Sequence, residues 1–213
     1  MILALFSLGV IGLIVFTAEI MWVFRLLRRE AGRKFIHILS AIWVSFWPFF
    51  LSFKTIAVLA FVLLAGVVLT RRLKVSKSIH TIERLSSGDL LFPVGIGLAS
   101  LLTTNKWIFC AAMLQIGLAD GLAGLIGRHY NMGKYRVMGS TKSVLGTATF
   151  ASVSMLIMLW LINYSDSGLS VRILPFALLV VTPIITVAEN ISPRGTDNIT
   201  VPVMTIFLLS LVR

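Results

Sequence analysis

The chain begins with the apolar run MILALFSLGVIGLIVFTAEIMWVF at residues 1–24, in which Glu19 is the only charged side chain. An α-helix crosses the hydrocarbon core of a bilayer with about 20 apolar residues, so this run is long enough to span it. It lacks the basic start and the small-residue cleavage site of a secretory signal peptide, and we expect it to be a membrane span. Runs at residues 55–70 and 150–162 are equally apolar and carry no charged residue.

The composition of the whole chain agrees with these runs. Apolar residues make up 58% and charged residues 13% of the 213 residues, against roughly 45–50% and 25% in soluble domains. The mean hydropathy is +0.98. Soluble enzymes and disordered tails are excluded, and the single cysteine, Cys110, excludes a scaffold built on internal disulfides. We predict one all-α transmembrane domain over residues 1–213, a polytopic integral-membrane helical bundle of about seven to eight transmembrane helices.

The distribution of basic residues predicts the topology of this bundle. Of the 19 lysines and arginines, 15 lie in four alternate loops at residues 25–34, 71–87, 127–142 and 189–198. Basic residues in short loops mark the cytoplasmic side, so we expect these loops inside and both termini outside. The net charge of +11 is explained by this topology and by attraction to anionic membrane lipids, so no nucleic-acid partner is expected. The expected spans are residues 2–24, 35–51, 55–70, 88–103, 107–126, 143–163, 170–188 and 199–212.

Acidic residues gather on the same predicted side of the membrane. Of the eight carboxylates, only Asp166 falls on the outer side. A carboxylate in or beside a span is costly unless it is paired, hydrated or bound to a metal. Glu30 and Glu83 are explained by ordinary ion pairs, whereas Asp120 and Glu189 are embedded in apolar runs. The pattern predicts a polar site that opens to the cytoplasm.

Asp120 lies in a glycine-rich segment, QIGLADGLAGLIGR at residues 115–128. At about 100° per residue, one helix face carries Asp120 together with Gly117, Gly121, Gly124 and Gly127. Such a face admits close approach by a ligand or by a neighbouring helix, and small residues at this spacing are common helix contacts in membranes. Both interpretations stay open at this point.

The segment TKSVLGT at residues 141–147 has the residues of a phosphate site. The cationic Lys142, the neighbouring hydroxyls and a glycine can face phosphate oxygens together with backbone N–H groups. The segment is not a Walker A motif, because Arg136 and Thr141 stand where that pattern requires glycines.

Five segments together resemble the family of dolichol kinases, phytol kinases and CTP-dependent diacylglycerol kinases, which are membrane enzymes related to phosphatidate cytidylyltransferases. They lie near residues 33–37, 87–93, 117–128, 141–147 and 189–202 and read RKFIH, SGDLLFP, GLADGLAGLIGR, TKSVLGT and ENIS followed by GTDNITVP. Two positions depart from the family's pattern. Val144 stands where an acidic residue is common, and Thr147 replaces a frequent serine.

The resemblance implies transfer of the terminal phosphate of CTP, or of another nucleoside triphosphate, to a lipid alcohol: a polyprenol, a phytol-like isoprenoid alcohol or a diacylglycerol. It also implies Mg²⁺ as cofactor, for which Asp120 is the first choice as ligand because hard cations take oxygen ligands. Glu189 and Asp197 are second choices, as metal ligands or to orient the alcohol.

The resemblance also assigns roles to the remaining candidate residues. His37 is either a general base or a helix-pairing residue, and Arg33 and Lys34 hold a phosphate or a lipid headgroup. Asp89, Pro93 and Asn198 are expected to form or support the lipid-binding site. The expected catalytic residues are Asp120, Lys142, His37 and Asp197. The expected nucleotide and phosphate site consists of Lys142, Ser143, Arg128, Gly121, Gly124, Gly127, Gly146 and Thr147.

Other functions remain as alternatives. A phosphatidate cytidylyltransferase-like CDP-lipid synthase would use the same residues on a phosphorylated lipid, and a non-enzymatic transporter would need a polar path to the opposite face. A scaffolding protein explains the helices but not the ordered segments. A CDP-alcohol phosphotransferase is excluded because it needs further aspartates soon after Asp120, and only Asp166 precedes Glu189.

Overall fold

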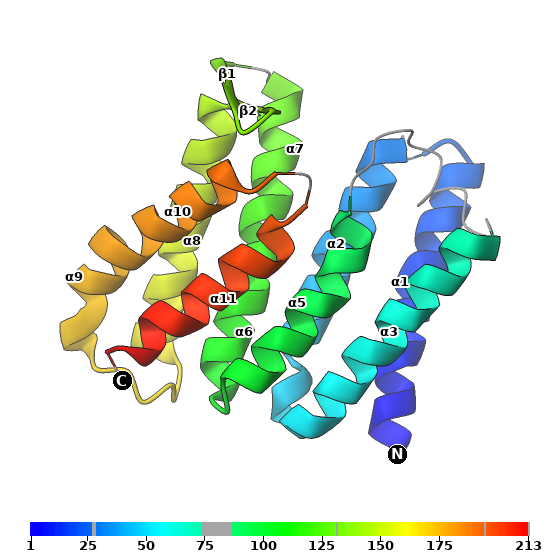
Figure 1. The fold of residues 1–213 in the computed structure, drawn as a ribbon, viewed down its shortest axis with the longest axis horizontal. Helices are drawn as coiled ribbons and strands as arrows, with labels where there is room; N and C mark the ends of the chain where they lie inside the picture. Colours follow the sequence, from blue (N-terminus) through cyan, green and yellow to red (C-terminus); the bar gives the residue numbers. More distant parts are fainter. Residues whose placement is uncertain (27–28, 74–86, 131, 194, 213) are drawn as a thin grey trace.

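The structure, a computed structural model, describes residues 1–26, 29–73, 87–130, 132–193 and 195–212. It is a bundle of helices with a small β-hairpin at one end (Figure 1). The helices are α1 (Ile2–Val23), α2 (Arg29–Ser45), α3 (Phe53–Leu73), α5 (Gly88–Leu102), α6 (Lys106–Leu114), α7 (Asp120–Tyr130), α8 (Val144–Tyr164), α9 (Leu174–Phe176), α10 (Thr182–Ile191) and α11 (Asp197–Ser210). The strands are β1 (Lys134–Val137) and β2 (Ser140–Ser143). Short π-helical segments, Gln115–Ala119 and Ala177–Val181, join α6 to α7 and α9 to α10, and 3₁₀ turns occupy Trp47–Phe49 and Val171–Ile173.

Several helices have the length and composition of membrane spans. Among the residues that the structure describes, five stretches qualify: Ile2–Val23, Phe53–Leu73, Lys106–Tyr130, Val144–Tyr164 and Val171–Ile191. Gly88–Leu102 and Asp197–Ser210 are apolar but shorter. The protein is therefore an all-α integral membrane protein, as predicted, and the number of seven to eight spans stays a prediction.

The ends of one predicted span differ clearly from the helix found. The span expected at 35–51 belongs to α2, which begins at Arg29 and ends at Ser45 before the 3₁₀ turn that contains Pro48. Proline has no backbone N–H to continue an α-helix, which explains the early end. Several charged residues of the four basic loops lie outside the described part of the chain: Arg28, Lys74, Lys77, Glu83, Arg84 and Arg194, together with the side chains of Arg29 and Glu30.

Residues 127–142 were expected to form a loop, and this expectation is wrong. The segment contains the end of α7 and most of an antiparallel hairpin, in which Lys134 pairs with Ser143 and Tyr135 with Lys142. The two residues of the turn have positive φ angles, 47° at Met138 and 75° at Gly139. Positive φ at both positions is the signature of a type I′ turn, which matches the twist of the two strands.

The two ends of the bundle differ in character. Both chain termini lie at one end, and the hairpin, the end of α7 and the connection from α10 to α11 lie toward the other (Figure 1). The described helices that flank the four basic loops have their loop-side ends at the same end of the bundle as the hairpin (Figure 1). The starts of α5 and α11 lie deeper in the bundle than the others (Figure 1). The segments named in the sequence are thus brought to one side. Which side of a membrane this is stays a prediction.

Candidate active site

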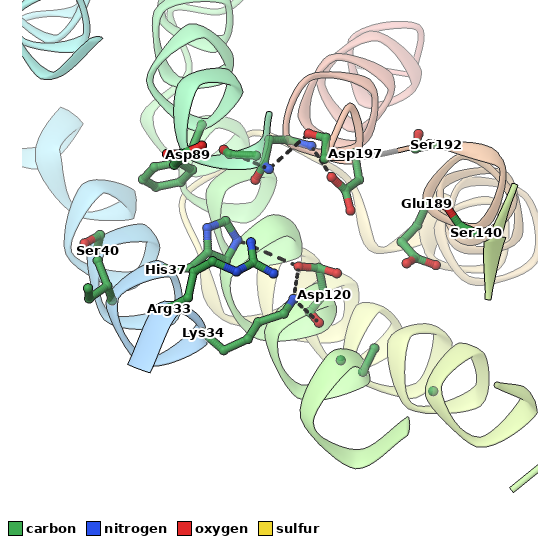
Figure 2. A pocket seen from close by; sticks show the side chains of 18 of the residues that line it. Arg33, Lys34, His37, Ser40, Asp89, Asp120, Ser140, Glu189, Ser192 and Asp197 are labelled. Carbon is green, nitrogen blue, oxygen red and sulfur yellow. Dashed lines mark hydrogen bonds and ion pairs between the residues drawn. The ribbon is translucent and has the colours of Figure 1, made fainter. Parts of the chain in front are cut away.

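A cavity of about 530 Å³ lies at the hairpin end of the bundle. It is lined by residues of α1, α2, α3, α5, α7 and the hairpin, and by the ends of α8, α10 and α11. Figure 2 shows part of this lining. All the candidate residues except Gly121 line it: Arg33, Lys34, His37, Asp89, Pro93, Asp120, Gly124, Gly127, Arg128, Lys142, Ser143, Gly146, Thr147, Glu189, Asp197 and Asn198. Segments that are distant in the sequence therefore form one site.

Three carboxylates from three helices meet in this cavity. Asp120 is the first residue of α7, Glu189 lies in the last turn of α10, and Asp197 is the first residue of α11. One oxygen of each lies within 4.8 Å of the others, and their side chains face a common space (Figure 2). Carboxylate oxygens this close repel one another unless cations neutralise them, and they form the donor set that hard divalent cations prefer.

Lys34 is the first of two lysines that neutralise this cluster. Its Nζ lies 2.7 Å from Asp120 Oδ2, although only 7% of the residue is exposed. The glycine face of α7 permits this contact, because a Cβ at Gly124 would lie 2.8 Å from Lys34 Cε. At Gly121 a side chain has no room, because a Cβ there would overlap Cγ1 of Ile38 on α2. Packing of α7 against α2 therefore positions Lys34, and a direct role of Gly121 in nucleotide binding stays a prediction.

Lys142 is the second lysine of the cluster. Its ammonium contacts Glu189 Oε1 and lies 3.1 Å from the Glu189 carbonyl oxygen. Glu189 is 4% exposed. Burial alone would lower the pKa of Lys142, but the adjacent carboxylate outweighs burial and holds this pKa above its ordinary value. Lys142 is therefore a permanent cation of the site at neutral pH.

His37 connects α2 to the segment before Asp120. Its Nε2 lies 2.9 Å from the Ile116 carbonyl oxygen and 3.8 Å from Asp120 Oδ2. The ring edge packs on Phe92, with 5.0 Å between ring centroids. Because a carbonyl only accepts hydrogen bonds, Nε2 carries the hydrogen. The nitrogen nearest Asp120 is therefore a donor, which fits the helix-pairing role, and the role of general base stays a hypothesis.

Ser143 and the adjacent glycines join the hairpin to α8. Ser143 Oγ caps the helix by accepting a hydrogen bond from the Gly146 N–H at 3.1 Å. A Cβ at Gly127 would lie 2.6 Å from Ser143 Oγ and 3.1 Å from Gly146 Cα. Glycine is therefore required where α7 meets the first turn of α8, and this contact places Lys142 beside Glu189.

The starts of α5 and α11 are joined beside the acid cluster. Asn198 Nδ2 donates hydrogen bonds to the carbonyl oxygens of Gly88, at 3.3 Å, and Gly195, at 3.1 Å. Gly195 has a φ angle of +94°, and a Cβ there would lie 2.6 Å from the Gly88 nitrogen. Arg71 of α3 holds Asp89 through its Nε, 2.9 Å from Oδ2. Asn198 and Asp89 thus anchor the cavity wall that carries Asp197.

Comparison with known proteins identifies the family. A phytol kinase from Synechocystis sp. is 32% identical to the chain over 208 residues, which cover 90% of this chain and 83% of that protein. The chain belongs to the phytol kinase family. This finding confirms the resemblance drawn from the five segments. No family model and no solved structure matches the chain.

In this member of the phytol kinase family, sequence reasoning missed one polar network. The Tyr135 hydroxyl donates a hydrogen bond to Asn190 Oδ1 at 2.6 Å and contacts Thr147 Oγ1. Thr147 Oγ1 lies 3.1 Å from the same Asn190 oxygen. The network joins the hairpin to α8 and α10, and Tyr135 faces Lys142 across the hairpin. Only the pairing of the strands, which the sequence did not signal, reveals this role.

Sequence reasoning also missed the apolar part of the cavity. Its lining in this family member includes Ile11 and Val15 of α1 and Leu63 and Val67 of α3. These residues lie in runs that read as ordinary lipid-facing spans, and only the packing of the helices places them beside a charged site.

Proposed function

We propose that the protein is a lipid-alcohol kinase, which transfers the terminal phosphate of a nucleoside triphosphate to the hydroxyl of an isoprenoid alcohol or a diacylglycerol. CTP is the proposed donor because of the family resemblance. The observation that carries the proposal is the cluster of Asp120, Glu189 and Asp197 in one cavity that has lysines at its acidic end and hydrocarbon side chains beyond. Phosphoryl transfer depends on positioning and on neutralising charge, which the charged end of the cavity can supply. The apolar side chains suit the hydrocarbon chain of a lipid acceptor.

The acid cluster fits Mg²⁺ as a cofactor. Asp120, Glu189 and Asp197 offer only oxygen ligands, from three separate helices, within 4.8 Å of one another. Three carboxylates face the ammonium groups of Lys34 and Lys142, so the cluster keeps an excess of negative charge when all five groups are ionised. When bound, Mg²⁺ would neutralise charge on the phosphate oxygens.

The basic residues supply the proposed phosphate contacts. Lys34 of α2 and Lys142 of β2 line the cavity, as do Arg33 and Arg128. An ammonium group on a flexible chain can move from a carboxylate to a phosphate oxygen within a few ångströms. These cations would hold the donor phosphates while the alcohol oxygen forms a bond to the terminal phosphorus. The alcohol proton passes to a carboxylate of the cluster, and the nucleoside diphosphate leaves.

The lengths of α5 and α11 support a lipid acceptor. With 15 and 14 residues these helices are about 21–22 Å long, less than the roughly 30 Å of a bilayer's hydrocarbon core. Their first residues border the acid cluster, below the tips of α2 and α7 (Figure 1). This depth suits the hydroxyl of an alcohol whose chain is dissolved in the membrane.

The proposed orientation places the site in the cytoplasm, where nucleotides are available. The positive-inside distribution of basic residues supports it. The native Cys110 is fully buried, so new cysteines can be labelled over a low background. A Met138→Cys variant, in the turn of the hairpin, should react with a membrane-impermeant maleimide only after cells are opened, and Tyr164→Cys should react in intact cells. The reverse pattern would contradict the orientation.

The reaction is tested with CTP carrying label on either the α or the γ phosphate. The purified protein, Mg²⁺ and a panel of phytol, a polyprenol and diacylglycerol should yield a γ-labelled lipid phosphate and release CDP. Parallel reactions with UTP and ATP establish the donor. If no alcohol is phosphorylated but phosphatidate acquires the α label with release of pyrophosphate, the CDP-lipid synthase alternative holds and the kinase proposal fails.

A further inference from the structure

The site cavity continues away from the acid cluster into a space lined by hydrocarbon side chains. We define this apolar arm by Ile11 and Val15 of α1, Ile36 of α2, and Leu63 and Val67 of α3. Ile11 and Val15 are four residues apart, as are Leu63 and Val67, so each pair forms a stripe along one face of its helix. Each helix therefore contributes one turn of apolar side chains to the arm.

A polar residue of α2 beside the arm does not change its apolar character. Ser40 lies one turn beyond Ile36 on α2, and it lines the same cavity. The residue is 4% exposed, and its hydroxyl has no hydrogen-bond partner within the described part of the protein. The hydroxyl oxygen presents almost no surface to the cavity, so the accessible lining of the arm remains apolar.

The packing of the helices leaves access to the arm from the membrane. α1 packs mainly on α2 and α3 mainly on α5, while α1 and α3 touch each other at few points. Both helices lie at the edge of the bundle (Figure 1). Their outward faces are apolar, with Leu13 of α1 and Val58 of α3 exposed. A hydrocarbon chain can enter sideways between α1 and α3 without leaving an apolar environment.

We propose that the apolar arm binds the hydrocarbon chain of the acceptor alcohol, and that Val15 and Leu63 determine which chains fit. This inference rests on the proposed kinase function. A nucleotide cannot occupy the arm, because branched aliphatic side chains offer no partners for its polar atoms. A chain lying between α1 and α3 extends from the hydroxyl, held at the acid cluster, into the bilayer.

Photolabelling tests the location of the chain independently of turnover. A C20 isoprenoid alcohol with a diazirine at its far end is bound to the protein in nanodiscs, irradiated and mapped by mass spectrometry. Labelling that an excess of unmodified alcohol suppresses should fall on the stretch of α1 around Val15 and on the stretch of α3 around Leu63. Suppressible labelling elsewhere, or labelling that the excess does not reduce, would overturn the inference.

Matched variants test the selection of the chain. Val15→Trp and Leu63→Trp fill the arm, whereas Leu13→Trp and Val58→Trp place the same bulk on exposed faces of the same helices. The first pair should lower the ratio of kcat/KM for a C20 alcohol to kcat/KM for a C5 prenol by at least ~10-fold, and thermal unfolding of each variant is the control for folding. The second pair should leave both values unchanged.

The outcomes separate this inference from the function on which it rests. If the wild-type protein phosphorylates the C20 alcohol and all four variants match it, the arm does not hold the chain. If the wild-type protein phosphorylates no alcohol, the kinase proposal fails, and the photolabelling still decides whether the arm binds a hydrocarbon chain.

Discussion

Replacing Gly127 by alanine should force α7 away from the first turn of α8. The added methyl group would lie 2.6 Å from Ser143 Oγ and 3.1 Å from the Gly146 Cα. The second atom belongs to the backbone, so the helices have to separate. Overpacking of this kind costs about 1–3 kcal/mol, and alanine in a helix recovers about 0.5–1 kcal/mol relative to glycine. We expect a net loss of stability of about 1–2 kcal/mol.

Gly66→Ala is the matched control, because a Cβ at Gly66 of α3 meets no atom within 4 Å. There the helical preference of alanine acts alone and should add about 0.5–1 kcal/mol. A chain of this size changes its Tm by about 2–4 °C per kcal/mol. In thermal unfolding measured in one detergent, the Tm of Gly127→Ala should therefore be about 2–8 °C lower, and that of Gly66→Ala about 1–4 °C higher, than the Tm of the wild type.

The same pair of variants links packing to the proposed phosphate site. Gly127→Ala displaces Ser143 and the first turn of α8, which directly follow Lys142. The affinity of this variant for CTP should therefore fall, whereas that of Gly66→Ala should equal the wild type. Equilibrium binding of CTP in detergent measures both. The reasoning is refuted if Gly127→Ala is as stable as Gly66→Ala, since the two helices would then not be in close contact.

The remaining predictions concern polar contacts of the site. Lys142→Met leaves the buried Glu189 carboxylate without its cation and should lower the stability by about 3 kcal/mol, which lowers the Tm by about 6–12 °C. Adding Glu189→Gln should restore most of the Tm but not the activity. If the Tm does not recover, the two side chains are not coupled. Tyr135→Phe removes the hydroxyl bound to Asn190, so the stability should fall by about 1 kcal/mol and the KM for the nucleotide should rise. Tyr130→Phe, at an exposed tyrosine, is the control. Equal Tm and KM values for the two variants would contradict the role of Tyr135.

Much of the site could be predicted because its chemistry appears in the residues themselves. Carboxylates such as Asp120 and Glu189 stand out in an apolar chain, since burying them is costly without a partner. The alternation of basic loops with apolar runs indicated that distant segments share one side of the bundle. The structure places these segments around one cavity.

The role of the glycine face could not be decided from sequence, because a glycine admits a ligand and a helix equally well. The structure shows Gly121 against Ile38 and Gly124 against Lys34, so both contribute to the contact with α2. The π-helical segment before Asp120 also changes the helical phase that the spacing assumed, since a π turn holds more residues than an α turn.

Two further features depended on contacts that a single sequence does not reveal. The hairpin turns at Met138 and Gly139, a pair that lacks the usual Asn-Gly signal of a type I′ turn. The apolar arm uses Val15 and Leu63, which in sequence look like any lipid-facing residues. In both cases the information lies in the packing of neighbouring segments and not in local composition.

The central claim is that the acid cluster holds the cation for phosphoryl transfer to a lipid alcohol, and Asp120→Asn tests it most directly. The asparagine side chain has the size of aspartate, and its amide oxygen can still accept a hydrogen bond from Lys34, but it carries no charge. With γ-labelled CTP, Mg²⁺ and phytol, turnover should fall at least ~100-fold, about 2.7 kcal/mol of transition-state stabilisation. Asp166→Asn, at the exposed opposite end of the bundle, should match the wild type. Near-normal turnover of Asp120→Asn would contradict the account.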